Sequence, residues 1–400
     1  MKLLFVHERF GAMAGAEVNA FLTATELKRR GHMLGIIHGQ STGKGEDGWR
    51  ETFAECFPIL NGESANIVRA AVKEFCPDVI YVHKMADLDV IEALIQSGRP
   101  LVRMVHDHDI YCMRSYKYNP LTRQICTRAA SPFCIFPCGA TLTRNRGGGL
   151  PVKWVSYFAK KKEIRLNRQF QRMVVATHYM RDELVRNHFD QQRIEIHAPV
   201  PRALENPTQS SFSSRNLILY SGQIIRGKGV DVLLESLAQV QLPFECIILG
   251  EGSHRPYCEQ LSRKLGLGDR VHFKGYIPQE DLRSFYRDAS LTVMSSVWPE
   301  PFGAAGLEGM RYGLPVVAFD AGGIKEWLIN AHNGFLVPWM DRAALAARIE
   351  QLLRNKALAR QMGERGRQLV RQKYDFNNYI QNLETMFTRV ISEAQVKVHA

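Results

Sequence analysis

Two glutamates, Glu300 and Glu308, lie eight positions apart in the stretch WPEPFGAAGLEGMRYGLPVVAFDAGG, residues 298–323. On one continuous helix, eight residues turn through about 800°, which leaves the two carboxylates about 80° apart instead of stacked as in an i, i+4 pair. Pro301 disfavours helical backbone at the residue before it, so Glu300 is predicted to lie on a loop. One acid on a loop and one on a helix can reach two different parts of one ligand.

The residues between the two acids predict a short helix, FGAAGLEGMRY, that ends at Gly313. Its first backbone N–H groups, at residues 303–305, lie beside small side chains and would favour an anion by about 0.3–1 kcal/mol. A sugar nucleotide has hydroxyls at both ends and an anion in the middle, which fits this arrangement. A single glutamate is more often a solvated surface residue, so the prediction rests on the joint pattern.

A glycine-rich turn between a predicted strand and a predicted helix offers cations for the same anion, in YSGQIIRGKGVDVLLESLA, residues 220–238. Ligands of open α/β folds bind at the carboxyl edge of the sheet, where this turn would lie. Lys228 is the predicted diphosphate contact, because a unit charge pair at 4 Å contributes about 4 kcal/mol at an effective dielectric of 20. Arg226 is either a second cation of the site or a solvent-facing turn residue.

The elements that would position these groups alternate between strand and helix along the whole chain, which predicts an α/β fold with parallel sheets. A stretch rich in Pro, Ser, Asn and Gln interrupts the alternation. We therefore predict an N-terminal sheet domain at 1–203, a linker at 204–214 and a C-terminal sheet domain at 215–375. Apolar residues at helical spacing predict a last helix at 376–400 that crosses back to the first domain.

The composition is that of a soluble globular protein, with 45% hydrophobic and 23% charged residues among 400. Neither a secretory signal nor a membrane-spanning helix is expected. The net charge is +12, and residues 101–200 alone hold 17 Lys and Arg against 7 Asp and Glu. This regional charge admits nucleic acid, an anionic membrane or a phosphorylated small molecule as partner.

The stretch EPFGAAGLEGMRYGLPVVAFDAGGIKEWL, residues 300–328, resembles the E-x7-E signature of family-4 retaining glycosyltransferases. The resemblance implies a GT-B fold, in which two Rossmann-like domains face each other across a cleft. It also implies that Glu308 holds the ribose hydroxyls and Glu300 a hydroxyl of the donor sugar. Around them, the implied donor-site residues are Gly222, Gln223, Arg226, Lys228, Gly250, Gly252, Tyr276, Phe302, Gly303 and Ala304.

Gln223 departs from the family pattern, which has an arginine at this position. We expect Arg226 to supply the missing charge. The stretch VHFKGYIPQEDL, residues 271–282, is similar to the family's nucleobase contact, so backbone groups near Tyr276 are predicted to meet the base.

Two stretches of the predicted first domain also resemble the family. FGAMAGAEVNAFLTATELKRRGH, residues 10–32, is similar to its glycine-rich loop, with Gly15 and Glu17 matching and Ala14 replacing a glycine. VRMVHDHDIYC, residues 102–112, ends a predicted strand with His106 and Asp107. A lone histidine there is more often structural, but the matching family residue contacts the donor sugar, so His106 is a predicted site residue.

The resemblance implies transfer of a hexose with retention, without a metal or other cofactor and without a protein nucleophile. Lys228, Glu300 and His106 are the predicted catalytic residues. The predicted donor is a UDP- or GDP-linked sugar, and the acceptor is a glycan or a lipid-linked molecule in surface polysaccharide, lipopolysaccharide or glycolipid biosynthesis. The alternatives are a GT-B sugar-nucleotide epimerase, or a basic protein that binds nucleic acid and leaves the two glutamates unexplained.

A basic stretch with aromatic residues, KWVSYFAKKKEIRLNRQFQRM at 153–173, predicts a helix that rests on an anionic membrane. A solvated helix with a few core aromatics is the alternative. We expect a cytoplasmic protein, peripheral on the inner face of the membrane, that does not bind nucleic acid. Four cysteines, Cys112, Cys126, Cys134 and Cys138, either hold a structural zinc, form a disulfide or remain free thiols.

Overall fold

The computed structural model describes residues 1–12, 15–59, 63–144, 152–200, 210–212, 215–278 and 281–399. They form two compact units. The first unit consists of Met1–Lys117, Thr127–Arg202 and Phe376–Ala400, and the second of Tyr118–Cys126 and Ala203–Asp375. Most of the predicted linker, 204–214, lies outside the described residues, and Ser210 within it bonds through its backbone N–H to Tyr312 O at 2.8 Å.

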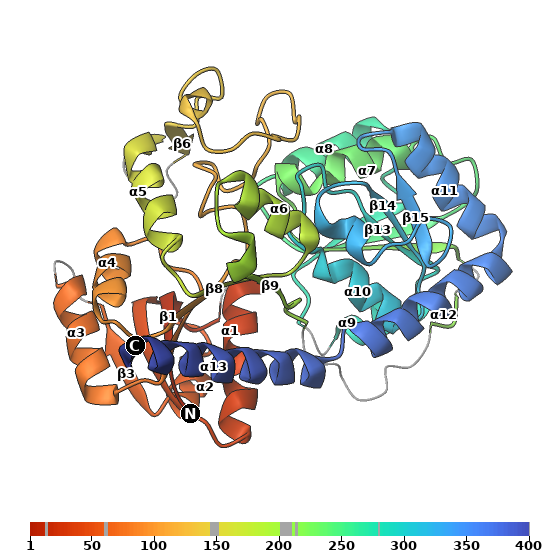
Figure 1. Ribbon diagram of the computed structural model, residues 1–400. Helices are drawn as coiled ribbons and strands as arrows, with labels where there is room; N and C mark the ends of the chain where they lie inside the picture. The colour runs from red at the N-terminus through yellow and green to blue at the C-terminus, as the bar shows by residue number, and fades with distance from the viewer. Residues whose placement is uncertain are drawn as a thin grey trace. The chain divides into compact units, whose positions relative to one another are not determined.

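The first unit is built on a seven-stranded parallel sheet in the order β3-β2-β1-β4-β5-β8-β9 (Figure 1). Its strands are β1 Lys2–Phe10, β2 Met33–Ser41, β3 Glu55–Pro58, β4 Val79–Val82, β5 Leu101–Met104, β8 Arg172–Val175 and β9 Ile194–Ile196. Its helices are α1 Gly15–Arg29, α2 Glu46–Thr52, α3 Ser64–Phe75, α4 Leu88–Gln96, α5 Tyr157–Asn167, α6 His178–Arg186 and α13 Phe376–His399. A small antiparallel ribbon joins β6 Leu142–Arg144 to β7 Val152–Trp154.

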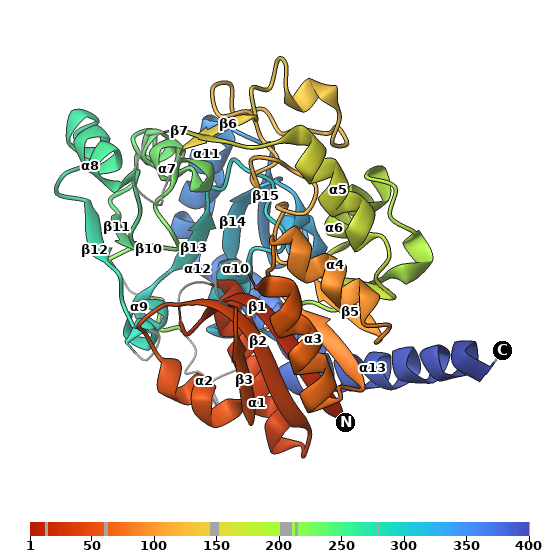
Figure 2. The ribbon, with the colours of Figure 1, turned by 90° about the vertical axis from the view of Figure 1, so that its left-hand side faces the viewer.

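The last helix, α13, belongs to the first unit and packs against α1 and β4 (Figure 2). The buried ring of Phe387 meets the Tyr81 ring edge-on, with centroids 5.1 Å apart. Farther along, Arg172 Nη2 of β8 lies 2.6 Å from Glu393 Oε1. Apolar burial and an ion pair therefore attach α13 to the sheet, as expected for a helix whose apolar residues follow helical spacing.

The second unit is built on a six-stranded parallel sheet in the order β12-β11-β10-β13-β14-β15. Its strands are β10 Leu217–Ser221, β11 Glu245–Leu249, β12 Val271–Gly275, β13 Leu291–Met294, β14 Val316–Phe319 and β15 Gly334–Val337. Its helices are α7 Val230–Leu237, α8 Arg255–Lys264, α9 Leu282–Asp288, α10 Ala304–Arg311, α11 Arg342–Arg354 and α12 Lys356–Lys373. Short 3-10 turns lie at Arg226–Lys228 and Gly323–Glu326.

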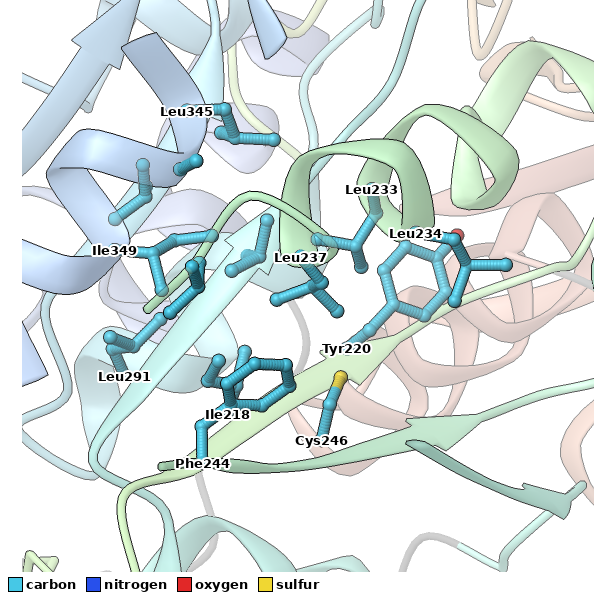
Figure 3. Close-up of a cluster of buried hydrophobic side chains, with 14 of the residues drawn as sticks. Ile218, Tyr220, Leu233, Leu234, Leu237, Phe244, Cys246, Leu291, Leu345 and Ile349 are labelled. Atoms are coloured by element: carbon cyan, nitrogen blue, oxygen red, sulfur yellow. The ribbon is translucent and has the colours of Figure 1, made fainter. Parts of the chain in front are cut away.

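The core of the second unit lies between this sheet and helices α7 and α11 (Figure 3). Strand residues Ile218 and Leu291 meet Leu237 of α7 and Ile349 of α11, and all four are fully buried. Strands buried on both faces read as continuous apolar runs, as in LILYS of β10 and LTVM of β13. This core anchors the loops at the carboxyl edge of the sheet.

The basic stretch at 153–173 is not one helix, which corrects the expectation from its composition. Ser156 Oγ accepts a hydrogen bond from Ala159 N–H and so caps α5, which ends at Asn167. Arg172 lies on β8, in register with Val102. Propensity could not reveal that the chain turns into the sheet here, because strand pairing with β5 decides it.

The segment Tyr118–Cys126 is flanked in sequence by first-unit residues but belongs to the second unit. Arg123 forms an ion pair with Asp231 of α7, and the two side chains are only 12% and 9% exposed. Tyr118 Oη lies near the backbone of Gly227. The chain therefore passes between the units more often than two consecutive domains require.

Candidate functional site

Two loops of the second unit are joined by hydrogen bonds at the carboxyl ends of β10 and β13. Gly227 O accepts bonds from the N–H groups of Val297 at 2.9 Å and Trp298 at 3.0 Å, and Ser295 Oγ donates to Lys228 O at 3.0 Å. Gly229, with φ of 65°, comes so close to Ser295 O that a Cβ would collide with it. The glycines thus allow the cationic turn and the WPEP loop to form one surface.

Glu300 and Lys228 form an ion pair at the centre of this surface. Lys228 Nζ lies 2.6 Å from Glu300 Oε1 and 5.0 Å from the centre of the Trp298 ring. Trp298 Nε1–H at 2.9 Å and the Ser296 hydroxyl donate to the same oxygen. Burial raises the pKa of Glu300, but Lys228 and the hydrogen bonds outweigh it, so its pKa lies below the usual value and the carboxylate is charged.

The helix after this loop, α10, begins without a side-chain cap. Its N-cap residue Gly303 has φ of 84°, in the left-handed region that favours glycine. Trp327 fixes the loop before α10, because its Nε1–H donates to Phe302 O at 2.6 Å. The uncapped N–H groups beside Ala304 are therefore available to an anion.

Glu308 lies on α10, one turn beyond those N–H groups. Arg311 Nη1 is 3.0 Å from Glu308 Oε2, and the two side chains are 7% and 18% exposed. The buried Tyr286 ring stacks on Tyr312 at 4.9 Å, and the Glu308 charge contributes to raising the pKa of both phenols, after burial. A carboxylate fixed in this way can accept hydrogen bonds from a vicinal diol.

Glycine-rich turns after β10, β11 and β12 complete this edge of the sheet. A Cβ at Gly250 would collide with Gly222 O, and a Cβ at Gly252 with Ile224 O, so the turns pack backbone to backbone. Gln223 and Arg226 are exposed on the first turn, and Tyr276 is 75% exposed after β12. The predicted residues of the second unit thus occupy neighbouring loops.

The predicted residue of the first unit, His106, follows strand β5. His106 Nε2 lies 3.0 Å from His83 Nδ1, and the two rings stack with centroids 5.2 Å apart. Next to it, Asp107 pairs with Lys84 at 2.8 Å. Burial, with further contributions from His7 and Lys84, lowers the pKa of His106 to about 3, so the ring is neutral at pH 7.

Gly15 is the first residue of α1, and a Cβ added there would meet nothing within 4 Å. Its neighbour Ala14 lies outside the described residues. Glu17, buried on the same helix, lies 3.6 Å from Arg9 at the end of β1. Among the described residues, no atom therefore crowds the open side of Gly15.

Sequence reasoning named Glu300, Lys228 and His106 but missed their partners Ser296, Trp298 and His83. The signal for the first two was their position, because both lie directly after β13 in the same loop as Glu300. His83 directly follows β4, as His106 follows β5 closely. Polar residues just beyond strand ends were the pattern that would have found all three.

A structural zinc, a disulfide and free thiols are the three alternatives that the sequence leaves open for the four cysteines. Within the described ranges, no three His, Cys, Asp or Glu side chains gather as metal ligands. Cys126 belongs to the second unit, whereas Cys112, Cys134 and Cys138 belong to the first. The segment is instead organised around Tyr157 and Met113, which pack with Cys134 and Cys138.

Two family models match the chain and together cover most of it. Residues 13–199 match "Glycosyltransferase Family 4" and residues 203–369 match "Glycosyl transferases group 1". This chain belongs to the family-4 glycosyltransferases. The prediction from the E-x7-E stretch is confirmed at the level of the family.

Curated relatives of this family-4 glycosyltransferase match it over shorter stretches. Alpha-D-kanosaminyltransferase of Streptomyces kanamyceticus is 30% identical over 44% of the chain and 46% of its own length. LpsE of Rhizobium meliloti, a lipopolysaccharide core biosynthesis glycosyltransferase, is 32% identical over 38% of the chain and 43% of its own length. The chain spans about half the length of the curated relatives that it matches.

Solved structures confirm the GT-B fold of this family-4 glycosyltransferase. HepE from Anabaena, crystallised with UDP and with UDP-glucose, superposes with a TM-score of 0.74 for the UDP complex and 19% identity, over 97% of this chain and all of HepE. Sucrose-phosphate synthase from Thermosynechococcus elongatus gives a TM-score of 0.74 with 17% identity, over 98% of this chain and 99% of its own. At such low sequence identity, the structural similarity establishes the fold alone.

Proposed function

We propose that this family-4 glycosyltransferase moves a sugar, with retention, from a nucleotide-diphosphate sugar to a glycan or lipid-linked acceptor. The observation that carries the proposal is the Lys228–Glu300 pair beside α10, with Glu308 one turn farther along that helix. A cation and free N–H groups suit a diphosphate, and two fixed carboxylates suit hydroxyls on either side of it.

The proposed chemistry is electrostatic. Charge develops on the diphosphate as the sugar leaves, and Lys228 with the first N–H groups of α10 would stabilise it. Lys228, Ser296 and Trp298 all donate to Glu300 Oε1, which lowers the nucleophilicity of this carboxylate. We therefore assign Glu300 to a sugar hydroxyl rather than to bond formation, and the step requires no metal.

We propose a UDP- or GDP-linked donor, with Glu308 on the ribose hydroxyls and backbone groups near Tyr276 at the base. The complexes of HepE with UDP and UDP-glucose make a uridine donor the first choice. His106 of the first unit is proposed to contact the donor sugar.

The proposal is tested by thermal unfolding of the full chain with UDP, GDP, ADP and dTDP sugars. A ligand that binds only the folded protein stabilises it by RT ln(1 + [L]/Kd), about 2.7 kcal/mol at 100-fold excess over Kd. We expect one base to raise the melting temperature, and Glu308→Ala to abolish the rise. Glu326→Ala, which changes another acid of the second unit, should keep it.

Release of the nucleoside diphosphate only when acceptor is present then separates transfer from epimerisation. A folded protein that none of the donors stabilises contradicts the proposal. Salt-sensitive binding of any polyanion, without a donor effect, would favour the nucleic-acid alternative.

We further propose contact with an anionic membrane, through a part of the first unit called here the basic apolar face. Its exposed apolar residues are Phe133, Ile135, Phe136, Leu142, Trp154 and Phe158. A cavity of about 520 Å³ beside α5 is lined by Lys161, Lys162, Arg165 and Arg168 together with Phe158. Apolar side chains that can enter the headgroup region beside cations fit a peripheral protein on the inner leaflet.

None of the described helices is long and apolar enough to cross a bilayer. Co-sedimentation with phosphatidylglycerol and phosphatidylcholine vesicles tests the surface contact. Each cation contributes about 1 kcal/mol near an anionic surface, so Lys161→Glu with Arg165→Glu should weaken binding to the anionic vesicles at least tenfold. The same charge change on α8, Arg263→Glu with Lys264→Glu, serves as control and should bind nearly as the wild type does.

A further inference from the structure

Three histidines of the first unit lie on or just after neighbouring strands of the sheet. His7 lies on β1, His83 follows β4 and His106 follows β5, and these strands are adjacent in the sheet. The His7 and His83 rings have centroids 6.3 Å apart, and those of His83 and His106 are 5.2 Å apart. The three rings therefore follow one another across β1, β4 and β5, with His83 in the middle.

The middle ring, His83, is fixed on all sides. It is 1% exposed and stacks on Phe5 at 5.5 Å, while Tyr81 meets it edge-on at 4.5 Å. Burial lowers the pKa of His83 well below the usual value and that of His7 to about 4, so both rings are neutral at pH 7. Each therefore carries a single N–H, whose position the surroundings decide.

The hydrogen bonds determine where those protons are. Arg9 N–H donates to His7 Nδ1 at 3.0 Å, so neutral His7 carries its proton on Nε2. Within the described residues, neither His7 Nε2 nor His83 Nε2 has a hydrogen-bond partner, and both atoms are buried. If His106 donated to His83, His83 would carry its proton on Nε2 and two unpaired N–H groups would lie buried together.

If the hydrogen bond between the two rings runs from His83 to His106 instead, only one unpaired N–H group is buried. If His83 Nδ1–H donates to His106 Nε2 across their 3.0 Å contact, His83 Nε2 is a buried bare acceptor, and the His7 Nε2–H is the one unpaired N–H group of the His7 and His83 rings. Unpaired buried N–H groups are rarer in proteins than under-satisfied acceptors. The second arrangement is therefore the stable one, and it requires neutral His106 to carry its proton on Nδ1.

We propose that His83 is a positioning residue that fixes His106 in the Nδ1–H tautomer, so that His106 meets its ligand as a hydrogen-bond donor. The ligand atom would be an oxygen of the donor sugar or of its phosphate. That assignment rests on the function proposed above, whereas the tautomer itself does not.

The tautomer is read by ¹⁵N NMR of the full chain labelled at histidine. His106→Gln identifies the signals of His106 among the thirteen histidines. We expect a bare Nε2 and a protonated Nδ1 in the wild type. His83→Leu should shift His106 toward Nε2–H or a mixture, and His83→Asn, whose amide can donate from nearly the position of Nδ1, should restore the wild-type pattern.

The matching kinetic expectation is a fall in kcat of roughly 10- to 100-fold for His83→Leu, the range for losing a group that orients an active residue. KM for the donor should stay within about twofold, because the nucleotide residues belong to the second unit. His83→Asn should recover most of kcat, which a merely structural role of the ring would not predict.

The role proposed for His83 and the proposed function can be contradicted independently of each other. A wild-type His106 protonated on Nε2, or an unchanged kcat in folded His83→Leu, overturns the role of His83 while transfer activity stands. Absence of any transfer or donor binding, with the Nδ1–H tautomer present, overturns the proposed function and leaves the tautomer assignment intact. Thermal unfolding of each variant confirms that it is folded.

Discussion

Lys228 and Glu300 are 72 residues apart in sequence, and Lys228 Nζ lies 2.6 Å from Glu300 Oε1. Their contact depends on parallel pairing of β10 with β13, which brings the two following loops to one edge. Sequence spacing predicted both residues as ligand contacts but not that they bind each other. In the absence of a donor, the ion pair holds Lys228 in place and keeps Glu300 charged.

Lys228→Met should lower the free energy of unfolding at pH 7 by about 2–4 kcal/mol, since it leaves a buried carboxylate without its cation. The folded pKa of Glu300 lies below its usual value, so the stability from this pairing is present above pH 4.5 and is lost as the pH falls through the folded pKa. The difference between wild type and variant should therefore shrink toward pH 4.

Urea unfolding at pH 7 and pH 4 measures this difference. Lys325→Met, at an exposed lysine of the same unit, is the control and should change stability by less than about 0.5 kcal/mol. A difference that is equal at both pH values would show that Lys228 acts through packing on Trp298 alone.

Arg226 and Gln223 allow a second test at single residues. Arg226 is exposed on the turn that also carries Lys228, and Gln223 occupies the position where the family has an arginine. Arg226→Ala should weaken UDP binding about tenfold in calorimetry, the effect of one lost charge-assisted contact. Gln223→Arg in that background should restore it. Equal affinity of Arg226→Ala and wild type would show that Arg226 is only a turn residue.

Helix α10 shows how far the position and the residues of one element can be predicted from the sequence. Its position was predicted from small residues, a closing glycine and a proline, and the observed bounds, Ala304–Arg311, lie within the predicted stretch. The sequence alone did not explain why glycines occupy positions 306 and 309 inside this helix. Gly306 faces the ring of Trp327 and Gly309 faces Thr292, so both exist because the helix lies directly on its neighbours.

Gly306→Ala should therefore destabilise the protein, although glycine to alanine normally stabilises a helix by about 1 kcal/mol. The added Cβ would collide with Trp327 Cη2, and overpacking of this kind costs about 1–3 kcal/mol. Because Trp327 also holds Phe302, donor affinity should fall with stability. Thermal unfolding with and without UDP measures both, and Gly268→Ala, where a Cβ meets nothing within 4 Å, is the matched control.

The sequence predicted strands and helices better than their partners for a physical reason. Burial on both faces leaves a continuous apolar run that can be read locally, whereas strand order and loop contacts depend on residues far away. The prediction of one helix at 153–173 was wrong for this reason, since Arg172 lies on strand β8 and pairs with β5. His83 and Arg311 were missed because each matters through its contact with a neighbouring side chain, and the spacing of residues in the sequence does not predict such contacts.

At the scale of the whole molecule, the chain passes between the two units at four places, after Lys117, Cys126, Arg202 and Asp375. The GT-B fold was predictable from alternating strands and helices together with the E-x7-E stretch. The assignment of Tyr118–Cys126 to the second unit was not, because it depends on contacts with residues far away in sequence, among them the buried ion pair between Arg123 and Asp231.

Arg123→Gln should release this segment from the second unit. Burial raises the pKa of Asp231, but His254, whose Nε2 lies 3.6 Å from Asp231 Oδ2, and the ion pair with Arg123 outweigh it and lower the value to about 2. The pair therefore stabilises the protein above about pH 4 and loses this effect as the pH falls toward 2. At pH 7, amide hydrogen exchange at 118–126 should accelerate roughly tenfold or more in the variant. Arg263→Gln on α8 should leave it unchanged, and slow exchange in Arg123→Gln would show that other contacts hold the segment.

The four crossings constrain how the coding sequence of this chain could be recombined with that of a relative. A single junction near residue 203 would join the first half of one parent to the second half of another, but Tyr118–Cys126 and α13 would then come from the wrong parent for the unit in which each one packs. An exchange of the whole second unit by recombination would have to carry two separate pieces of coding sequence together, those for Tyr118–Cys126 and Ala203–Asp375. Inheritance of the two halves is thus linked, and new specificities are expected to arise by point substitution in the loops more readily than by shuffling of domains.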